Sequence, residues 1–539
     1  MLSRKLRPIH LFMISLNGVL GTGLYGRSGQ ILELGGPLAV FVSYSLVGLV
    51  AFAVMKCLTE LLCVWPVPGA LSLFVRTFLD NELGIAVGIA YWFAFSIGFS
   101  ALIASAASYL DFWTEDVPAV TLVVIYIILP AILVGVNTVE VEMYGWIEVI
   151  TGCLKIAFFG IIFVTLIVIH STNWEDPLPY DPDAAKRWTE SLFMSISIAS
   201  FAYVGVEIIA VSAVEAKWSK THADSETLPR SQQEDGISIA STIKFTANYI
   251  PIIIPVGYAV AGLLVSINFK RDDCRLPRLS WLQQPGCDRP ENSTTSPFII
   301  ITEGAPIGHV FNGFILFTVL SCANTNLYVA SRTLFGLTHN LPGNGWIVRW
   351  LAWFGETDSR RVPLRAMAFS ALAFFWVPFL QYPRSFDAGT KVGMFIEILS
   401  QIGSIGTIIV WACVCGAYIR YYNCLQVHGE ILKQEGILLK ETYIPHRSHW
   451  QPILAWLGLA GCVILLLVCN GAFLWHRFHF FPFLSAYLPI LVFLVLWVVL
   501  KIFSAGNWSG APLTEQDTTM QLRILNELRQ GTSWYQLAE

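Results

Sequence analysis

Charged side chains are scarce in this sequence of 539 residues: 13% are Asp, Glu, Lys or Arg, whereas 55% are hydrophobic. This balance differs from that of ordinary soluble domains and is typical of a chain that folds in lipid. The formal net charge of -4 offers no basic field for a polyanion, which argues against nucleic-acid binding. We therefore expect the lipid bilayer to be the main surroundings of the chain.

Motifs for catalysis, nucleotide binding and metal binding are also missing. The chain contains no HExxH, GxSxG or GxxxxGKS/T motif and no CxxC pair with a histidine partner. Of its 11 cysteines, all but Cys274 and Cys287 lie in or beside apolar runs, where cysteine usually packs as a small hydrophobic side chain. We expect no enzyme, no metal site and no cofactor.

Long apolar runs are abundant. Because a transmembrane helix needs about 20 mostly apolar residues, we predict about 12 transmembrane helices and thus an all-α polytopic membrane protein. These spans lie near residues 9–31, 37–62, 84–111, 119–136, 146–170, 190–215, 246–267, 308–338, 363–382, 391–421, 451–475 and 481–504. The membrane domain, 1–504, is followed by a tail, 505–539, whose short amphipathic helix carries Met520, Ile524 and Leu528 on one face.

The distribution of basic residues predicts the orientation in the membrane. Lys and Arg are enriched in cytoplasmic loops, and here they follow the sixth and the eighth span, at Lys217, Lys220, Arg230, Arg349, Arg360 and Arg361. An even number of spans then leaves both termini in the cytoplasm. We expect a multi-pass integral membrane protein of the plasma membrane.

The loop between the seventh and eighth spans is basic too, but other residues place it outside. It contains Cys274 and Cys287, a candidate disulfide pair, and Asn292 in an Asn-Ser-Thr glycosylation acceptor. Both features suit an oxidising extracellular compartment, although motifs this short also arise by chance.

Glycines interrupt two of the predicted spans near the middle of the membrane. The first span contains Gly21, Thr22 and Gly23, and the sixth contains Gly205. Because backbone groups find no water in hydrocarbon, such breaks are costly unless they line a protected cavity. Two breaks five helices apart, in spans of opposite orientation, are typical of a five-plus-five inverted repeat with a midplane site. Close helix packing is the alternative explanation of the glycines.

The backbone at such breaks suits both ends of an amino acid. N–H groups at a half-helix N-terminus favour a carboxylate, whereas freed carbonyls favour an ammonium group or a cation. Two ionisable residues lie at similar depth. Glu207 either satisfies the broken backbone or carries a proton, and Lys155 either replaces a bound sodium ion or pairs with Glu148 or Glu207.

Three stretches of the chain are similar to those of a known family. Arg4–His10 leads into Gly21–Tyr25, Phe201–Ala216 contains the sixth-span break, and Leu327–Leu337 ends the eighth span. Together they resemble fungal amino-acid permeases of the amino acid–polyamine–organocation superfamily. The resemblance implies the five-plus-five inverted repeat (LeuT-like) and proton-coupled import of amino acids by alternating access.

The resemblance also implies roles for single residues. Gly21, Thr22 and Gly23 hold the substrate carboxylate, and Gly205 offers backbone carbonyls to its ammonium group. Phe201 matches the aromatic residue that closes over the ligand. Lys155 falls where related transporters place a lysine thought to stand in for sodium.

Some residues depart from the family pattern. The third span has no acidic residue around Leu102, which argues against cationic substrates, and Lys217–Lys220 replaces the usual Asn-Pro-Arg turn after the sixth span. These departures resemble the sensor branch of the family. They leave a second hypothesis, a sensor of the same fold that binds amino acids and signals to cytoplasmic partners without transporting them.

Overall fold

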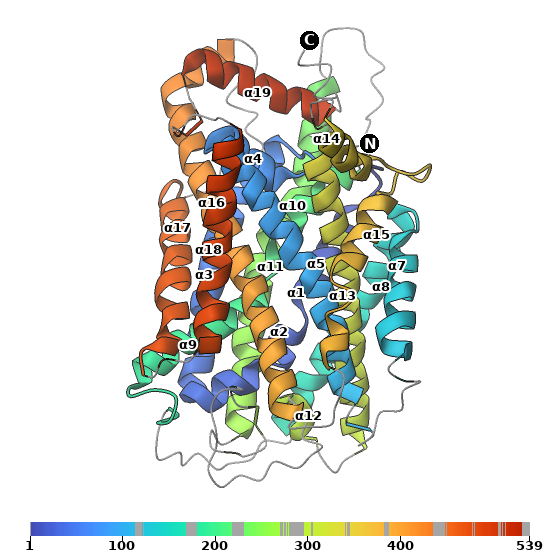
Figure 1. The fold of residues 1–539 in the computed structure, drawn as a ribbon, viewed down its shortest axis with the longest axis vertical. Coiled ribbons are helices and arrows are strands. Elements are labelled where there is room, and N and C mark those ends of the chain that lie inside the picture. The colour runs from blue at the N-terminus through green and yellow to red at the C-terminus, as the bar shows by residue number, and fades with distance from the viewer. Residues whose placement is uncertain are drawn as a thin grey trace.

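The computed structural model is an elongated bundle whose helices run roughly along its longest axis (Figure 1). It describes residues 2–110, 112–113, 121, 123–168, 180–217, 231–269, 273, 276–277, 279, 296–302, 306–339, 341, 345–381, 388–434, 448, 450–476, 478, 480–504, 508, 510–511 and 514–530. The predicted disulfide pair, Cys274 and Cys287, and the predicted glycosylation site, Asn292, lie outside the described residues.

The first five predicted spans begin with an interrupted one. α1 (Pro8–Val19) and α2 (Thr22–Tyr25) lead into α3 (Ser28–Val64), in which Gly36, with φ of 71°, separates the end of the first span from the second. The following elements are α4 (Ala70–Phe78), α5 (Asn81–Leu110), the π-helical η1 (Val124–Ile128), α7 (Leu129–Asn137) and α8 (Val141–Val168).

The next five predicted spans also begin with an interrupted one. It comprises α9 (Trp188–Ser200), η2 (Phe201–Tyr203), η3 (Val206–Ile208), α10 (Ile209–Ser212) and η4 (Ala213–Glu215). The later elements are α11 (Ser231–Asn268), α12 (Pro297–Ile300), α13 (Ile307–Thr338), α14 (Trp346–Ala352), η5 (Trp353–Gly355), α15 (Leu364–Ala373), η6 (Pro378–Gln381) and α16 (Ala388–Gln434). α17 (Ile453–Ile464), η8 (Leu465–Cys469), η9 (Asn470–Leu474), α18 (Phe480–Phe503) and α19 (Glu515–Gln530) complete the chain.

The prediction of an all-helical polytopic protein is confirmed. Among the described residues, nine helices are long and apolar enough to cross a membrane. The other three predicted spans are interrupted or short: the first is divided at Leu20 and Gly21, and the fourth and ninth correspond to the shorter apolar helices Val124–Asn137 and Leu364–Leu380.

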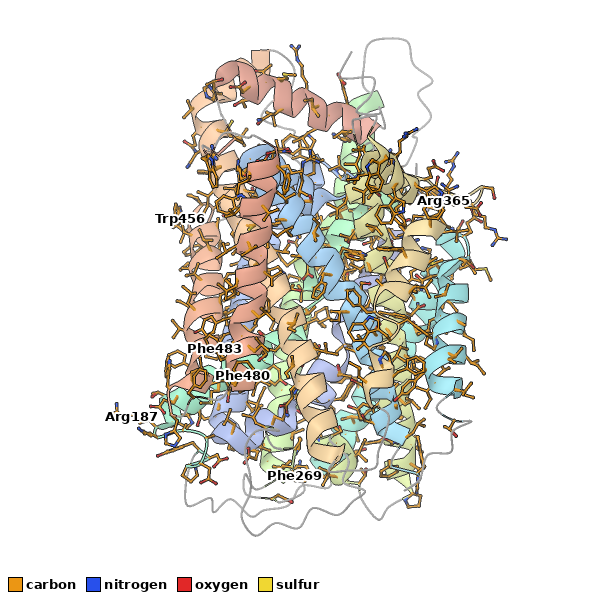
Figure 2. The ribbon with its side chains drawn as sticks, viewed as in Figure 1. Arg187, Phe269, Arg365, Trp456, Phe480 and Phe483 are labelled. Atoms are coloured by element: carbon orange, nitrogen blue, oxygen red, sulfur yellow. The ribbon has the colours of Figure 1, made fainter. Side chains whose placement is uncertain are left out.

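The outer surface of the bundle is apolar, as contact with lipid requires. Leu154 and Val164 on α8 are 53% and 61% exposed, and Val495 on α18 is 61% exposed. Figure 2 shows Trp456 of α17 at the periphery of the bundle, at about the height of Arg365 and on the opposite side, with Arg187 closer to the other end. An apolar belt between charged ends matches the hydrocarbon core and the two interfaces of a bilayer.

Both described termini lie at one end of the bundle, which we call the terminal face (Figure 1). The α19 helix lies across it, and Arg4 Nη2 donates a hydrogen bond to Arg529 O at 3.0 Å. Burial lowers the pKa of Arg4 to about 10, and the positive charge of Arg529 acts in the same direction. The two ends of the chain are therefore joined.

The α19 helix packs on the bundle through a row of leucines. Leu522, Leu525 and Leu528 are buried, whereas Met520 is 63% exposed. Of the three residues predicted to share one face, Leu528 is therefore buried, Ile524 half-buried and Met520 exposed. Trp65 Nε1, at the end of α3, donates to Asn526 Oδ1 of α19 at 2.8 Å.

Candidate functional site

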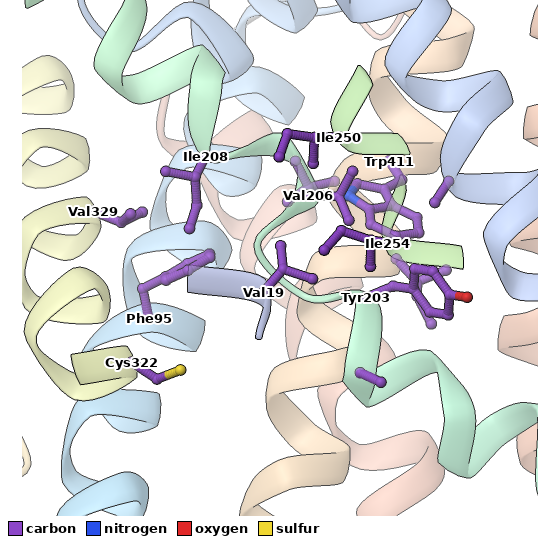
Figure 3. Packing of buried hydrophobic residues seen from close by; sticks show 14 of the residues in the cluster. Val19, Phe95, Tyr203, Val206, Ile208, Ile250, Ile254, Cys322, Val329 and Trp411 are labelled. Atoms are coloured by element: carbon purple, nitrogen blue, oxygen red, sulfur yellow. The ribbon is translucent and has the colours of Figure 1, made fainter. Parts of the chain in front are cut away.

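The interruptions of the first and sixth spans lie side by side in the interior. A Cβ atom placed on Gly23 would lie 2.4 Å from the Cα of Ala202, and one on Gly18 would lie 2.2 Å from Cδ1 of Ile208. Figure 3 shows Val19 of α1 among Tyr203, Val206 and Ile208 of the interrupted sixth span. Glycine at positions 18 and 23 is what allows the two backbones to approach so closely.

The sixth span is interrupted by a turn that needs glycine. Gly205 has φ of 106° and ψ of -7°, a conformation that side chains with a Cβ atom rarely adopt. The helical bonding pattern stops at Tyr203 and resumes with Ile208 N donating to Gly205 O at 3.1 Å. Gly205 is thus where the sequence analysis expected the break.

The first span is interrupted between Val19 and Thr22, which leaves carbonyls without helical partners. Side chains from three other helices supply the missing donors. Lys155 Nζ donates to Asn17 O at 2.9 Å and to Leu20 O at 3.0 Å, and Tyr258 donates to Val19 O at 2.7 Å. Because a carbonyl without a donor costs several kcal/mol in a bilayer, these contacts hold the break open.

A thiol shares these two carbonyls with Lys155. Cys322 Sγ, from α13, donates to Asn17 O at 3.1 Å and to Leu20 O at 3.0 Å, and it lies 3.5 Å from Lys155 Nζ. Lys155 is 1% exposed. An ammonium group ringed by backbone oxygens occupies a place that would otherwise suit a monovalent cation.

The alternative that Lys155 pairs with a carboxylate is not what the structure shows. Within the described residues, Lys155 makes no ion pair with Glu148 or Glu207; its ammonium group is used on the backbone of α1. The physical reason is proximity, since the end of α1 offers two carbonyls at about 3 Å and a negative helix end.

Glu207 lies at the sixth interruption and is fully buried. Tyr91 of α5 donates to Oε1 at 3.1 Å, and Trp411 Nε1 of α16 donates to Oε2 at 3.0 Å. Both donors are neutral groups. Each carboxylate oxygen therefore accepts a hydrogen bond, and neither of these donors is a cation. A carboxyl group in such surroundings can bind or release a proton.

The predicted substrate residues surround the two interruptions. Gly21, Gly23 and Gly205 are buried, whereas Thr22 and Phe201 are half-buried. The first N–H groups of α2, from Thr22 onward, precede its first helical hydrogen bond, which Tyr25 N donates to Gly21 O at 3.5 Å. These groups lack intrahelical acceptors and are suited to an anionic oxygen.

On the side of the interruptions that faces away from the terminal face, an ion pair joins a residue shortly after α2 to α16. Arg27 Nη1 lies 3.7 Å from Glu397 Oε1 of α16, and its guanidinium carbon lies 5.8 Å from the centre of the Phe201 ring. Gln30 Nε2 donates to the same carboxylate oxygen at 2.5 Å. The contacts described on this side are between side chains.

On the side that faces the terminal face, backbone hydrogen bonds as well as side chains cover the interruptions. Leu6 N donates to Glu215 O at 2.8 Å and Lys217 N to Leu6 O at 2.8 Å, so the N-terminal segment pairs with the end of the sixth span. The carboxylate of Glu215 accepts from Tyr328 at 2.5 Å and lies 3.4 Å from Arg332 Nε. The interruptions are thus enclosed from both sides.

Comparison with known proteins agrees with this geometry. A family model described as amino acid permease matches residues 10–507. The chain belongs to the amino acid permease family. This confirms the resemblance read from the sequence, and with it a secondary transporter for amino acids rather than an enzyme.

Two fungal relatives illustrate the range of the family. The permease is 27% identical to the lysine/arginine permease of Candida albicans, covering 97% of this chain and 86% of that one. It is 25% identical to the dicarboxylic amino acid permease of Saccharomyces cerevisiae, covering 93% and 77%.

A solved structure supports the fold. The manganese transporter of Eremococcus coleocola superposes with a TM-score of 0.55 at 13% identity, covering 96% of this chain and 95% of that one. The likeness concerns the fold alone. It agrees with the predicted inverted repeat with broken first and sixth helices.

Sequence reasoning missed several residues of the permease interior. Three aromatic side chains each donate one hydrogen bond at the interruptions: Tyr91 and Trp411 to the carboxylate of Glu207, and Tyr258 to Val19 O. In the sequence they resemble any other aromatic residue of an apolar span. Cys322 lies in the unusually polar stretch of the eighth span, which was a usable signal. A sulfur atom aimed at two carbonyls is visible only in three dimensions.

Proposed function

We propose that this permease imports amino acids together with protons by alternating access, with the substrate bound between the interrupted first and sixth spans. The observation that carries the proposal is the close approach of the two interruptions at Gly23 and Ala202, which brings the N–H groups at the start of α2 next to the broken backbone of the sixth span in a closed interior. Gly21, Thr22 and Gly23 would hold the carboxylate of the substrate, and the carbonyls around Gly205 its ammonium group.

Phe201 is proposed to cover the substrate on the side away from the terminal face. Its ring is half-buried and lies beside the guanidinium group of Arg27. Opening would then require Arg27 to part from Glu397 while the backbone pairing at Leu6 keeps the other side closed. Alternating access of this kind is the expected behaviour of an inverted-repeat transporter.

Glu207 is proposed to carry the proton, and Lys155 to replace a sodium ion. The support for Glu207 is its complete burial with two neutral donors, because its charge can change without breaking an ion pair with either. The support for Lys155 is its position on the carbonyls of Asn17 and Leu20. An ammonium group there would take the place of a metal cation.

Amino acids with uncharged side chains are the proposed substrates. The charged groups near the interruptions balance: Arg27 faces Glu397, and Lys155 counters the negative end of α1. The third span supplies no carboxylate near Leu102 that could receive a cationic side chain. The orientation proposed is the one from loop charge, with the terminal face in the cytoplasm and the chain in the plasma membrane.

An uptake screen tests the proposal. Cells lacking their own amino-acid permeases would express the chain and be given each common amino acid, with and without a protonophore. We expect saturable uptake of uncharged amino acids that the protonophore abolishes. Saturable binding without any uptake would instead favour a sensor, and uptake that ignores the protonophore would remove the proton from the proposal.

A further inference from the structure

A second buried carboxylate, Glu148, lies between Lys155 and the terminal face. Both residues belong to α8, and seven residues of helix separate them by about 10 Å. The start of α8 is at the terminal face, because Glu142 in its first turn lies 3.6 Å from Arg7 of the N-terminal segment. Glu148 is 1% exposed and has no part in the mechanism proposed above.

Amide side chains from three helices surround this carboxylate. Asn17 Nδ2 of α1 donates to Oε2 at 2.5 Å, and Asn324 Nδ2 of α13 donates to Oε1 at 2.9 Å. Asn137 Nδ2 of α7 in turn donates to Asn324 Oδ1 at 2.8 Å. We call Asn17, Asn137, Glu148 and Asn324 the Glu148 cluster.

Two amide oxygens of the Glu148 cluster lack a donor among the described residues. Within the described part of the chain, the Oδ1 atoms of Asn17 and Asn137 are buried and receive no hydrogen bond. An unsatisfied buried acceptor costs about 1–3 kcal/mol. An ionised carboxylate cannot help, since it only accepts, but a protonated one donates. If the Asn17 amide rotated by about 180°, its Oδ1 atom would take the place of Nδ2 and could accept a hydrogen bond from a protonated Glu148.

Asn17 links the Glu148 cluster to the first interruption. Its side chain donates to Glu148, and its backbone carbonyl accepts from Lys155 at 2.9 Å. The end of α1 is therefore held by a carboxylate on one side and an ammonium group on the other. If this end of α1 moves, Glu148 loses its shortest hydrogen bond, and its charge is left with less compensation in a buried place.

We propose that Glu148 binds a proton from the terminal face when the end of α1 withdraws, and releases it when α1 docks again. The step adds one proton to a carboxylate and gives a neutral carboxylic acid. The proposal rests on alternating access, in which α1 is a moving element. Acid at the terminal face then favours the conformation with α1 withdrawn and slows the return.

The charged and titratable groups around Glu148 come from four elements. They are Lys155 and Tyr144 of α8, His10 of α1, Cys322, Tyr328 and Arg332 of α13, and Glu215 of η4. Arg332 and Glu215 already form an ion pair, and Tyr144 stacks on Tyr328 with ring centres 4.8 Å apart. Among the described residues of this region, Glu148 is thus the carboxylate that no ion pair holds.

Infrared titration of purified protein tests proton binding without transport. In a Glu207→Gln background, we expect the band of a carboxylic acid shielded from water to grow as the pH is lowered. The band should be lost in Glu148→Gln and kept in the control Glu142→Gln, a carboxyl in the same helix that pairs with Arg7. Asn17→Leu should shift its midpoint to higher pH by at least about one unit, because one donor to the carboxylate is gone.

Exchange in proteoliposomes tests the consequence. A radiolabelled mixture of the common amino acids is exchanged with the pH clamped separately on each side, and orientation is scored by protease digestion of an N-terminal tag. We expect the rate to fall by up to about tenfold per pH unit as the terminal side is acidified. Glu148→Gln should abolish this dependence, and Glu148→Asp should restore it.

The outcomes separate the two proposals. A shielded carboxylic-acid band that survives Glu148→Gln, or an unchanged response to terminal-side pH in that variant, would overturn the role of Glu148 and leave amino-acid transport standing. Loss of the band in a protein that exchanges no amino acid would support proton binding at Glu148 and refute the proposed function. If Glu148 served only to join helices, the variants would change thermal stability with no effect on either titration.

Discussion

The first and sixth interruptions lie side by side but have opposite chemistry. At the first, carbonyls left by α1 face an ammonium group and a thiol, from Lys155 and Cys322. At the sixth, the carboxylate of Glu207 faces a phenol and an indole, from Tyr91 and Trp411. One break is held by a fixed positive charge, and the other contains a negative charge that a proton can cancel.

This difference suggests different tasks for the two interruptions. The negative end of a helix is stabilised by a cation within its last turn, and Lys155 supplies that cation from the protein itself. The sixth interruption has no such permanent partner among its described contacts. We propose that structural closure belongs to the first break and the response to the proton gradient to the second.

The largest effect is expected when the sixth interruption loses its shape. In Gly205→Leu, a side chain must adopt φ of 106°, and its Cβ would lie 3.1 Å from Cδ1 of Ile208 and 3.2 Å from Gly18 O. A positive φ alone costs about 1–2 kcal/mol. We expect amino-acid binding and uptake to be lost, measured by radioligand binding to purified protein.

The matched control for Gly205 is Gly160, which lies in α8 and has no atom within 4 Å of the position that a Cβ would take. Gly160→Leu should bind and transport normally. Unchanged affinity in Gly205→Leu would show that the substrate site lies elsewhere and that the two interruptions differ for another reason.

The next largest effect is expected at the first interruption. Lys155→Met keeps the apolar stem but removes the donor to two buried carbonyls, each worth about 1.5–3 kcal/mol as a hydrogen bond to a charged group. We expect transport to fall by at least about 100-fold at equal expression, with a lowered melting temperature. Lys56→Met is the control, since Lys56 Nζ donates to Asn248 Oδ1 at 2.6 Å away from both breaks. Normal transport in Lys155→Met would disprove the proposed fixed charge.

The two interruptions could be located from the sequence because their signals are local. Glycine clusters near mid-span are unusual in hydrocarbon, and Gly205 does adopt a conformation that favours glycine. The helical fold followed from apolar run lengths, and the boundary between the first two spans coincides with Gly35-Gly36-Pro37, where Gly36 has φ of 71°.

The partners of the interruptions could not be located in the same way. Tyr91 and Trp411 meet Glu207 across the bundle, and nothing in the chain near them indicates that their polar atoms face inward. Lys155 was expected either on a sodium-like site or in an ion pair, and only the position of α1 decides between these. Long-range packing, not local pattern, selects such contacts.

A smaller effect, confined to coupling, is expected at Glu207. Glu207→Gln keeps an acceptor for one of its two donors but cannot change charge, so we expect accumulation driven by a proton gradient to be lost. Exchange of amino acids without a gradient should fall by less than about tenfold, the cost of roughly one hydrogen bond. Both are measured in vesicles with and without an imposed gradient. Glu190→Gln, at the start of the same span, is the control; accumulation by Glu207→Gln would place the proton elsewhere.

The smallest effect is expected at Cys322, and it measures how much of the first interruption depends on charge. Its thiol donates to the same carbonyls as Lys155, at 3.1 Å and 3.0 Å, but a thiol is a weak donor. We expect Cys322→Ala to slow uptake by less than about fivefold. Cys153→Ala, an exposed cysteine of α8, serves as control for uptake kinetics. If Cys322→Ala were as damaging as Lys155→Met, the thiol and not the ammonium group would hold the end of α1.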